Sequence, residues 1–179
     1  AVSYNNESAV TEDDQAVTDA AAFTNTYAPG AAILYGSENL TVTKNLNRDW
    51  IADDPATADV NEKDSFTFTL TTDDEATRQA IEAQTVILPE ATSIVVDTDT
   101  VNSEGAHQAS FGEITFTEAG TYVFTIAEEG ESHDGLTYDK EVRHVTVEVT
   151  DNTDGTMTAR VTGVTPAAGL TFTNVYKPE

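Results

Sequence analysis

The stretch Leu170-Thr171-Phe172-Thr173-Asn174-Val175-Tyr176, near the end of the chain, has the alternation of a β-strand with one polar residue out of place. Because successive side chains of a strand point to opposite faces, Leu170, Phe172, Asn174 and Tyr176 share one face. That face is apolar except for the carboxamide of Asn174. Burying a carboxamide without hydrogen bonds costs roughly 1 to 3 kcal/mol. The sequence therefore predicts that Asn174 meets polar partners in the core.

Two other predicted strands also place a polar residue in an apolar register. In residues 40–44, Lys44 continues the face of two apolar side chains, and in residues 121–128, Glu128 continues the face of three. The chain has four lysines, and Lys44 alone extends an apolar register. The other three lie in a polar loop, beside a turn or after the last strand: Lys63, Lys140 and Lys177.

These three polar residues have a chemical use if they meet. Loss of water lowers the pKa of a buried lysine, which can then be a neutral amine nucleophile, and raises the pKa of a buried glutamate. A protonated Glu128 would donate to the Asn174 amide oxygen and then carry protons so that ammonia leaves. The product is an amide between the side chains of Lys44 and Asn174. The alternative is an ordinary Lys44–Glu128 ion pair at the rim of a sandwich, with Asn174 capping a loop; periodicity leaves both open.

Short alternating segments predict the fold. Together with a single short helix over residues 76–82, after the capping residues 72–75, they favour an antiparallel β-sandwich. The expected strands cover residues 40–44, 66–70, 85–88, 93–96, 110–116, 121–128, 140–150, 156–164 and 170–176.

An internal repeat predicts the domain organisation. The segment Phe23-Thr24-Asn25-Thr26-Tyr27-Ala28-Pro29 returns as Phe172-Thr173-Asn174-Val175-Tyr176-Lys177-Pro178, offset by 174 − 25 = 149 positions, and five of the seven residues are identical. A period of this size is about one domain. We therefore expect residues 1–29 to be the last strands of a preceding repeat, residues 30–39 a linker, and residues 40–177 a complete domain.

Composition excludes several functions. The chain has 179 residues and a formal net charge of −24, which disfavours binding to nucleic acid or to an anionic membrane. It has no cysteine, and no apolar run approaches the roughly 20 residues of a membrane span. The first residues lack the features of a signal peptide. A cytosolic protein or an internal piece of a longer secreted chain would both fit, and the repeat favours the secreted chain.

No other catalytic or metal site is expected. His107, His133 and His144 are too scattered to share a metal ion. The acidic stretches 97–99 and 151–154 lack the distal glutamate of a calcium loop and fit turns better. There is no phosphate-binding glycine loop and no nucleophile elbow, so we expect no cofactor, no metal and no hydrolase activity.

Three motifs resemble a known family. Residues 40–46 (LTVTKNL), 120–129 (GTYVFTIAEE) and 172–176 (FTNVY) closely resemble, in the same order, the motifs of the Gram-positive pilin isopeptide-linkage domain of the FctA or T-antigen type. The resemblance spans residues 40–177. It implies an all-β, immunoglobulin-like antiparallel β-sandwich of pilin or Cna B type.

The resemblance also assigns roles by position. It implies a Lys44–Asn174 isopeptide bond with Glu128 as the catalytic proton shuttle. Glu129 is a neighbouring alternative whose side chain would point to the opposite face. Asn25 would be the crosslink residue of the preceding repeat.

The function expected from this resemblance is a stalk or shaft repeat of a Gram-positive adhesin or pilus, crosslinked once and not an enzyme in the usual sense. Its partners would be neighbouring repeats, with a host ligand bound through other domains, and it would be extracellular and wall-anchored through another part of the protein. Polymerisation through this segment is not expected, because it shows no sorting signal. The alternative is a ligand-binding adhesin module that recognises a glycan or protein through the acidic loop at 49–64 or at 97–108.

Overall fold

The computed structural model describes residues 2–5, 22–52, 63–132 and 134–178. Its two helices are α1 (Gly36–Asn39) and α2 (Glu75–Glu82). The first strands are β1 (Val2–Asn5), β2 (Ala22–Asn25), β3 (Ala32–Leu34), β4 (Thr41–Leu46), β5 (Ser65–Thr71), β6 (Val86–Ile87) and β7 (Ser93–Asp97). The remaining strands are β8 (His107–Ser110), β9 (Ile114–Phe116), β10 (Gly120–Glu128), β11 (Leu136–Thr137), β12 (Arg143–Asp151), β13 (Met157–Thr165) and β14 (Thr171–Tyr176).

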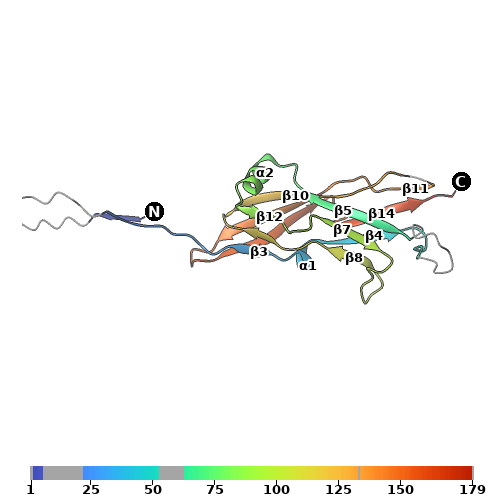
Figure 1. The fold of residues 1–179 in the computed structure, drawn as a ribbon, viewed down its shortest axis with the longest axis horizontal. Helices are drawn as coiled ribbons and strands as arrows, with labels where there is room; N and C mark the ends of the chain where they lie inside the picture. The colour runs from blue at the N-terminus through green and yellow to red at the C-terminus, as the bar shows by residue number, and fades with distance from the viewer. Residues whose placement is uncertain (1, 6–21, 53–62, 133, 179) are drawn as a thin grey trace, which may run out of the picture.

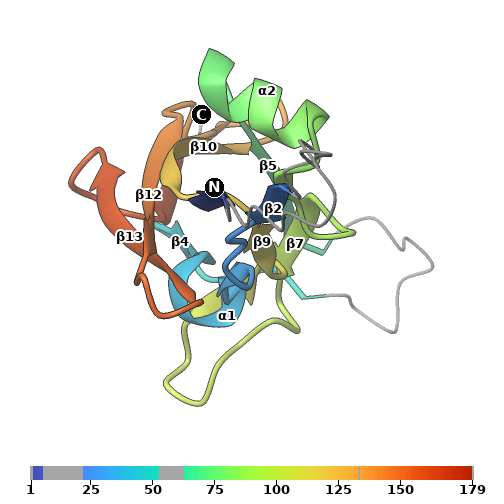
Figure 2. The ribbon, with the colours of Figure 1, turned by 90° about the vertical axis from the view of Figure 1, so that its left-hand side faces the viewer.

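Two sheets form the walls of the domain. One has the order β13-β12-β10-β5-β7 and the other the order β11-β14-β4-β8, and a smaller sheet, β3-β9-β6, adjoins them. Among the described strands every pair is antiparallel except β14 and β4, which run parallel. Viewed along the long axis, the strands surround the core and α2 covers one side (Figure 2). The all-β fold expected from the sequence is confirmed.

The core lies between the two main sheets because their strands alternate. Along β5, residues Phe66, Phe68 and Leu70 are buried while their neighbours face outward. Across the core, the Phe68 ring of β5 lies 4.9 Å from the Phe172 ring of β14. Strand β14, from which the prediction started, therefore packs its apolar face against the opposite sheet.

Helix α2 begins where the sequence predicts it. The Asp74 carboxylate caps it by accepting hydrogen bonds from the Thr77 backbone N–H and hydroxyl, each at 2.8 Å. The expectation of a single helix was wrong, because α1 forms one further turn before β4. The expected strand at 110–116 is also two strands, since residues 111–113 leave the ladder between β8 and β9.

Residues 30–39, expected to be a linker, are folded against the domain. They form β3 and α1, and β3 pairs with β9 through Ala32 and Phe116. Ala32 and Leu34 are buried, so the segment contributes to the core and is not a free linker. Three alternating residues gave too short a pattern to predict this strand, whose partner is distant in sequence. The boundaries of the repeat themselves stay a prediction.

The N-terminal residues form a separate hairpin. Strands β1 and β2 pair antiparallel, with Val2 opposite Asn25, beyond one end of the domain body, and the C-terminus lies at the other end (Figure 1). The polar loop expected between these strands lies outside the described residues.

Candidate functional site: a buried lysine, glutamate and asparagine

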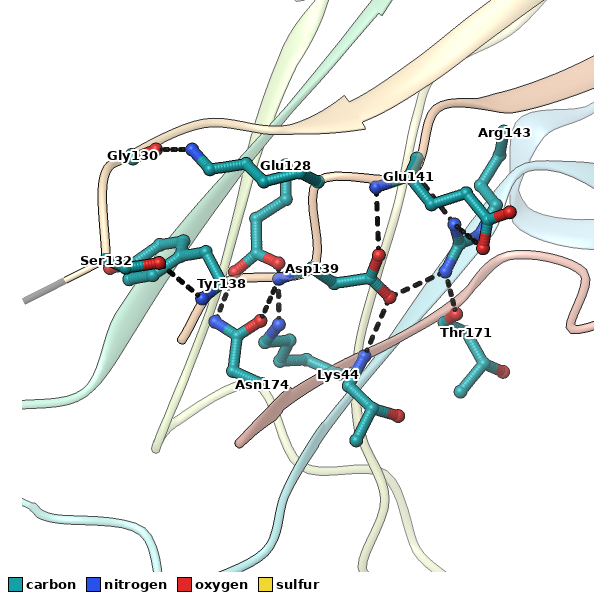
Figure 3. A network of polar contacts seen from close by, with 12 residues as sticks. Lys44, Glu128, Gly130, Ser132, Tyr138, Asp139, Glu141, Arg143, Thr171 and Asn174 are labelled. Carbon is teal, nitrogen blue, oxygen red and sulfur yellow. Dashed lines mark hydrogen bonds and ion pairs between the residues drawn. The ribbon is translucent and has the colours of Figure 1, made fainter. Parts of the chain in front are cut away.

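The structure brings Lys44, Glu128 and Asn174 together in the core. Strands β4 and β14 are parallel neighbours, with Lys44 opposite Phe172, so Lys44 and Asn174 project from one sheet. Glu128 ends β10 in the other sheet and faces them (Figure 3). The exposed fractions are 1% for Lys44, 7% for Glu128 and 0% for Asn174. An ion pair at a solvated rim does not fit these values.

One carboxylate binds both nitrogen atoms. Lys44 Nζ donates to Glu128 Oε2 at 2.7 Å, and Asn174 Nδ2 donates to Glu128 Oε1 at 2.7 Å. The two nitrogens that would exchange places in an isopeptide reaction thus contact separate oxygens of the same group. A proton can pass from one nitrogen to the other through this carboxylate without water.

Burial sets the protonation chemistry. Loss of water lowers the pKa of Lys44 to about 8, and the hydrogen bond and charge of Glu128 oppose this shift. The Phe66 ring, with its centroid 4.8 Å from Lys44 Nζ, contributes to the apolar surroundings. Burial likewise raises the pKa of Glu128, against the effect of Lys44 and Asn174. The lowered pKa of Lys44 raises the fraction of neutral amine, which is the nucleophilic form, and the raised pKa of Glu128 makes its carboxylate a stronger base for the proton that Nζ loses.

The amide of Asn174 is oriented by a backbone group. The N–H of Asp139 donates to Asn174 Oδ1 at 2.7 Å (Figure 3). A backbone N–H can only donate, so it must face the amide oxygen, and the amide nitrogen must face Glu128. The prediction that Glu128 donates to that oxygen was wrong, because Glu128 accepts from the amide nitrogen instead. In the structure the group aimed at the carbonyl is the Asp139 N–H, in the geometry of an oxyanion donor.

Asp139 is held in place by a buried arginine. Arg143 Nη2 donates to Asp139 Oδ2 at 2.7 Å and to the Thr171 carbonyl at 2.8 Å. Asp139 Oδ2 also accepts from the backbone N–H of Thr173 at 3.2 Å. Burial raises the pKa of Asp139, but the hydrogen bonds from Glu141 N, Thr173 N and Arg143 outweigh it, so the pKa is lowered. The network ties the loop before β12 to β14.

Sequence reasoning missed Arg143 and Asp139. Arg143 is 1% exposed and begins the buried register that Val145, Val147 and Val149 continue along β12. That register was visible in the sequence and could have identified Arg143 by the argument used for Lys44. The Asp139 N–H has no such signal, because every non-proline residue carries one.

The other predicted residues lie elsewhere. Glu129 points away from the site, where its carboxylate accepts from the Thr69 hydroxyl at 2.7 Å. Asn25 is exposed in the β1–β2 hairpin, outside the domain body. The remaining lysines do not join the site: Lys63 pairs with Asp97 and Asp99, Lys140 donates to the Gly130 carbonyl, and Lys177 is exposed.

No metal site is visible in the part of the chain that the structure describes, where no three His, Asp or Glu side chains gather. His107 stacks on Trp50 with ring centroids 3.7 Å apart, and His144 contacts Asp73. His133 lies outside the described residues. Neither described helix has the length and apolar composition of a membrane span.

The fold and the buried triad define a class, an all-β domain of the pilin isopeptide type that the sequence resembles. Residues 40–177 match the FctA family, described as the Spy0128-like isopeptide containing domain. The match covers well over half of the chain, which therefore belongs to this family. Membership supports a structural role in a pilus or shaft. A search of curated proteins found no significant match.

Solved structures to which this chain is similar include major pilins of Streptococcus pyogenes. A mutant of the major pilin shares 21% identity at a TM-score of 0.48, over 81% of this chain and 50% of that chain. The unmutated major pilin shares 18% identity at a TM-score of 0.45, over 81% of this chain and 50% of that chain. The T-13 major pilin shares 22% identity at a TM-score of 0.45, over 83% of this chain and 55% of that chain. This chain spans about half the length of those pilins.

Proposed function

We propose that this domain is a structural repeat of a pilus or adhesin shaft on the bacterial surface, and that it crosslinks itself once between Lys44 and Asn174. The observation that carries the proposal is the Glu128 carboxylate, which binds Lys44 Nζ and Asn174 Nδ2 at 2.7 Å each. Membership of an isopeptide-containing family supports the same chemistry.

The reaction balances within the three side chains. Neutral Lys44 Nζ attacks Asn174 Cγ, a new C–N bond forms, and negative charge develops on Oδ1, where the Asp139 N–H stabilises it. Glu128 takes the proton that Nζ loses and gives it to Nδ2. The bond from Cγ to Nδ2 then breaks, ammonia leaves and an amide remains. Glu128 ends as it began, but the product stays attached, so the chain reacts once and does not turn over.

Folding supplies the effective concentration. The two reacting side chains lie on adjacent parallel strands, with Asn174 two residues beyond the partner of Lys44. Groups held in this way react as if at very high concentration, which replaces the activation that a leaving group or cofactor would provide. The closed site also excludes water, so hydrolysis of the amide does not compete.

The alternative role, ligand binding through acidic loops, has less support. In the loop after β7, Lys63 binds Asp97 at 2.9 Å and also pairs with Asp99, so these carboxylates are engaged within the domain. Most of the other loop, residues 53–62, lies outside the described residues. Anchoring to the cell wall and binding of a host ligand would belong to other parts of the protein.

Intact-mass measurement tests the proposal. We expect the wild type to be lighter than its sequence by one ammonia, and a digest to yield one branched peptide joining Lys44 to Asn174. Glu128→Ala should restore the full mass. Glu129→Ala is the matched control, because it removes a neighbouring carboxylate that faces away from the site, and it should keep the loss of ammonia. A wild type of full mass would contradict the crosslink.

A further inference from the structure

The segment that precedes the domain contacts a hairpin at the far end of the domain's own sheet. Tyr27 Oη donates to Asp151 Oδ1 at 3.0 Å and accepts from the backbone N–H of Gly155 at 3.1 Å. The backbone N–H of Gly30 donates to the Gly155 carbonyl at 2.8 Å. The chain therefore enters the domain across the turn that joins β12 to β13, at the end opposite to the C-terminus (Figure 1).

This turn is built to present those groups. Asp151 Oδ1 also accepts from the Thr153 N–H at 2.8 Å, and Asp154 Oδ1 accepts from the Thr156 N–H at 3.0 Å, so both carboxylates hold the turn together. Gly155 has φ +92°, which leaves its N–H and carbonyl free of a side chain and open to the incoming segment. The Tyr27 phenol is exposed over 55% of its surface, so its contact with the turn is polar rather than apolar.

The sequence repeat places the equivalent positions at the other end of the domain, with the tyrosine retained. The offset of 149 that relates Asn25 to Asn174 relates Tyr27 to Tyr176 and Gly30 to Glu179. Tyr176 ends β14, where the Arg48 guanidinium lies 5.4 Å from its ring centroid and the two residues line an open pocket. A Cβ at Gly30 would lie 3.7 Å from the Gly155 carbonyl oxygen, an ordinary contact, so a glutamate can take that position.

We propose that the turn Asp151–Gly155 is the docking site for the last strand of the preceding repeat, and that Tyr176 docks in the same way on the equivalent turn of the following repeat. The partner is a second copy of this domain type. The tyrosine links the two copies, because its ring stays on its own domain and its hydroxyl binds the turn of the next domain. This rests on the proposed tandem shaft. Its consequence is a fixed angle between neighbouring repeats, in place of a flexible joint.

The contact on the existing chain is tested by hydrogen exchange of backbone amides. Tyr27→Phe removes the hydroxyl and keeps the ring, so the Gly155 amide should exchange roughly three- to tenfold faster, the effect of losing one hydrogen bond. Tyr35→Phe is the control, because Tyr35 is also exposed and its described hydrogen bonds are those that its carbonyl accepts from Glu38 and Asn39. Equal exchange of Gly155 in the wild type and Tyr27→Phe would overturn the contact.

The junction itself is tested in a two-domain chain of residues 1–179 followed by a second copy of residues 31–179, which keeps the natural period of 149. With isotope label in the second copy alone, its Gly155 amide should be protected as in the single domain. Tyr176→Phe in the first copy should remove that protection by a similar factor. If the protection of the Gly155 amide in the second copy does not depend on Tyr176 of the first copy, the proposed docking of Tyr176 on the next repeat is wrong. The mass of the same chain counts crosslinks independently, so failure of the crosslink and failure of the junction are distinguishable.

Discussion

Removing the proposed crosslink should lower the unfolding free energy of the domain by about 5 kcal/mol. The loop that the bond closes runs from Lys44 to Asn174, or 174 − 44 = 130 residues. The chain-entropy relation used for disulfides gives about 5 kcal/mol for a loop of this length, through loss of freedom in the unfolded chain. The proposed bond therefore acts on stability as a constraint on nearly the whole unfolded domain, and not as a local contact.

The variant must remove the bond without leaving a buried charge. Lys44 and Glu128 are both buried, and deleting one partner of a buried pair typically costs 3 to 5 kcal/mol by itself. The double variant Lys44→Met, Glu128→Gln keeps the volumes, carries no charge and cannot react. Lys44→Met alone is the control, and we expect it to be less stable than the double variant because it leaves Glu128 without its cation.

Denaturation in guanidinium chloride with linear extrapolation measures the difference in unfolding free energy between the wild type and the double variant. Besides the lower midpoint, the double variant should have the larger m-value, because its unfolded chain is not held together and exposes more surface. If the wild type is lighter by one ammonia and the double variant still matches its stability within about 1 kcal/mol, the entropic reasoning is refuted even though the bond exists.

Three further outcomes follow from the structure. In a chain prepared unfolded under denaturing conditions and then refolded, the rate of ammonia loss should rise about tenfold per pH unit up to about pH 8 and then level off, because the lowered pKa of Lys44 sets the fraction of neutral amine. Mass spectra recorded over time measure this rate, and a rate independent of pH below about 8 would contradict the mechanism. Asp139→Asn keeps the backbone N–H but weakens the network that positions it, so bond formation should slow severalfold and stability should fall by about 3 kcal/mol. Because the folded pKa of Asp139 is lowered, that stability is present at neutral pH and is lost in acid below about pH 4, and chemical denaturation at both pH values should show the gap between wild type and variant close. Gly36→Ala would place a Cβ 2.0 Å from the Phe111 carbonyl oxygen and should cost roughly 1 to 3 kcal/mol in thermal or chemical unfolding, whereas Gly163→Ala meets nothing within 4 Å and should be close to neutral.

The register of the strands made much of the site predictable. Alternation fixes the face of each side chain, so Lys44, Glu128 and Asn174 could each be assigned to a core face before their strands were paired. Their meeting required the order of the strands, which alternation does not contain. The resemblance to the FctA family provided that order, and the structure places β4 beside β14 with β10 across the core.

What the sequence could not provide depends on contacts between distant segments. Strand β3 is three residues long and exists because β9 pairs with it, and β11, of two residues, exists because β14 does. The Asp139 N–H is aimed at Asn174 by the Arg143 network, which joins the loop at residues 139–141 and the start of β12 to β14. The burial of Arg143 could have been predicted, since it lies in the buried register of β12. An arginine at the start of a strand is, however, more often solvated.

The position of the proposed bond explains why such a repeat needs it. The chain enters the domain at the end where β4 begins and leaves from β14 at the opposite end, and these two strands are parallel neighbours (Figure 1). Pulling on the two ends therefore shears β4 against β14. The proposed amide between Lys44 and Asn174 would carry that load from one strand to the other directly, and residues 45–173 would then lie outside the path of the force. The rest of the domain would then need only the ordinary stability of a folded sandwich, and the tyrosine contact proposed for each junction would set the direction in which the force is passed to the next repeat.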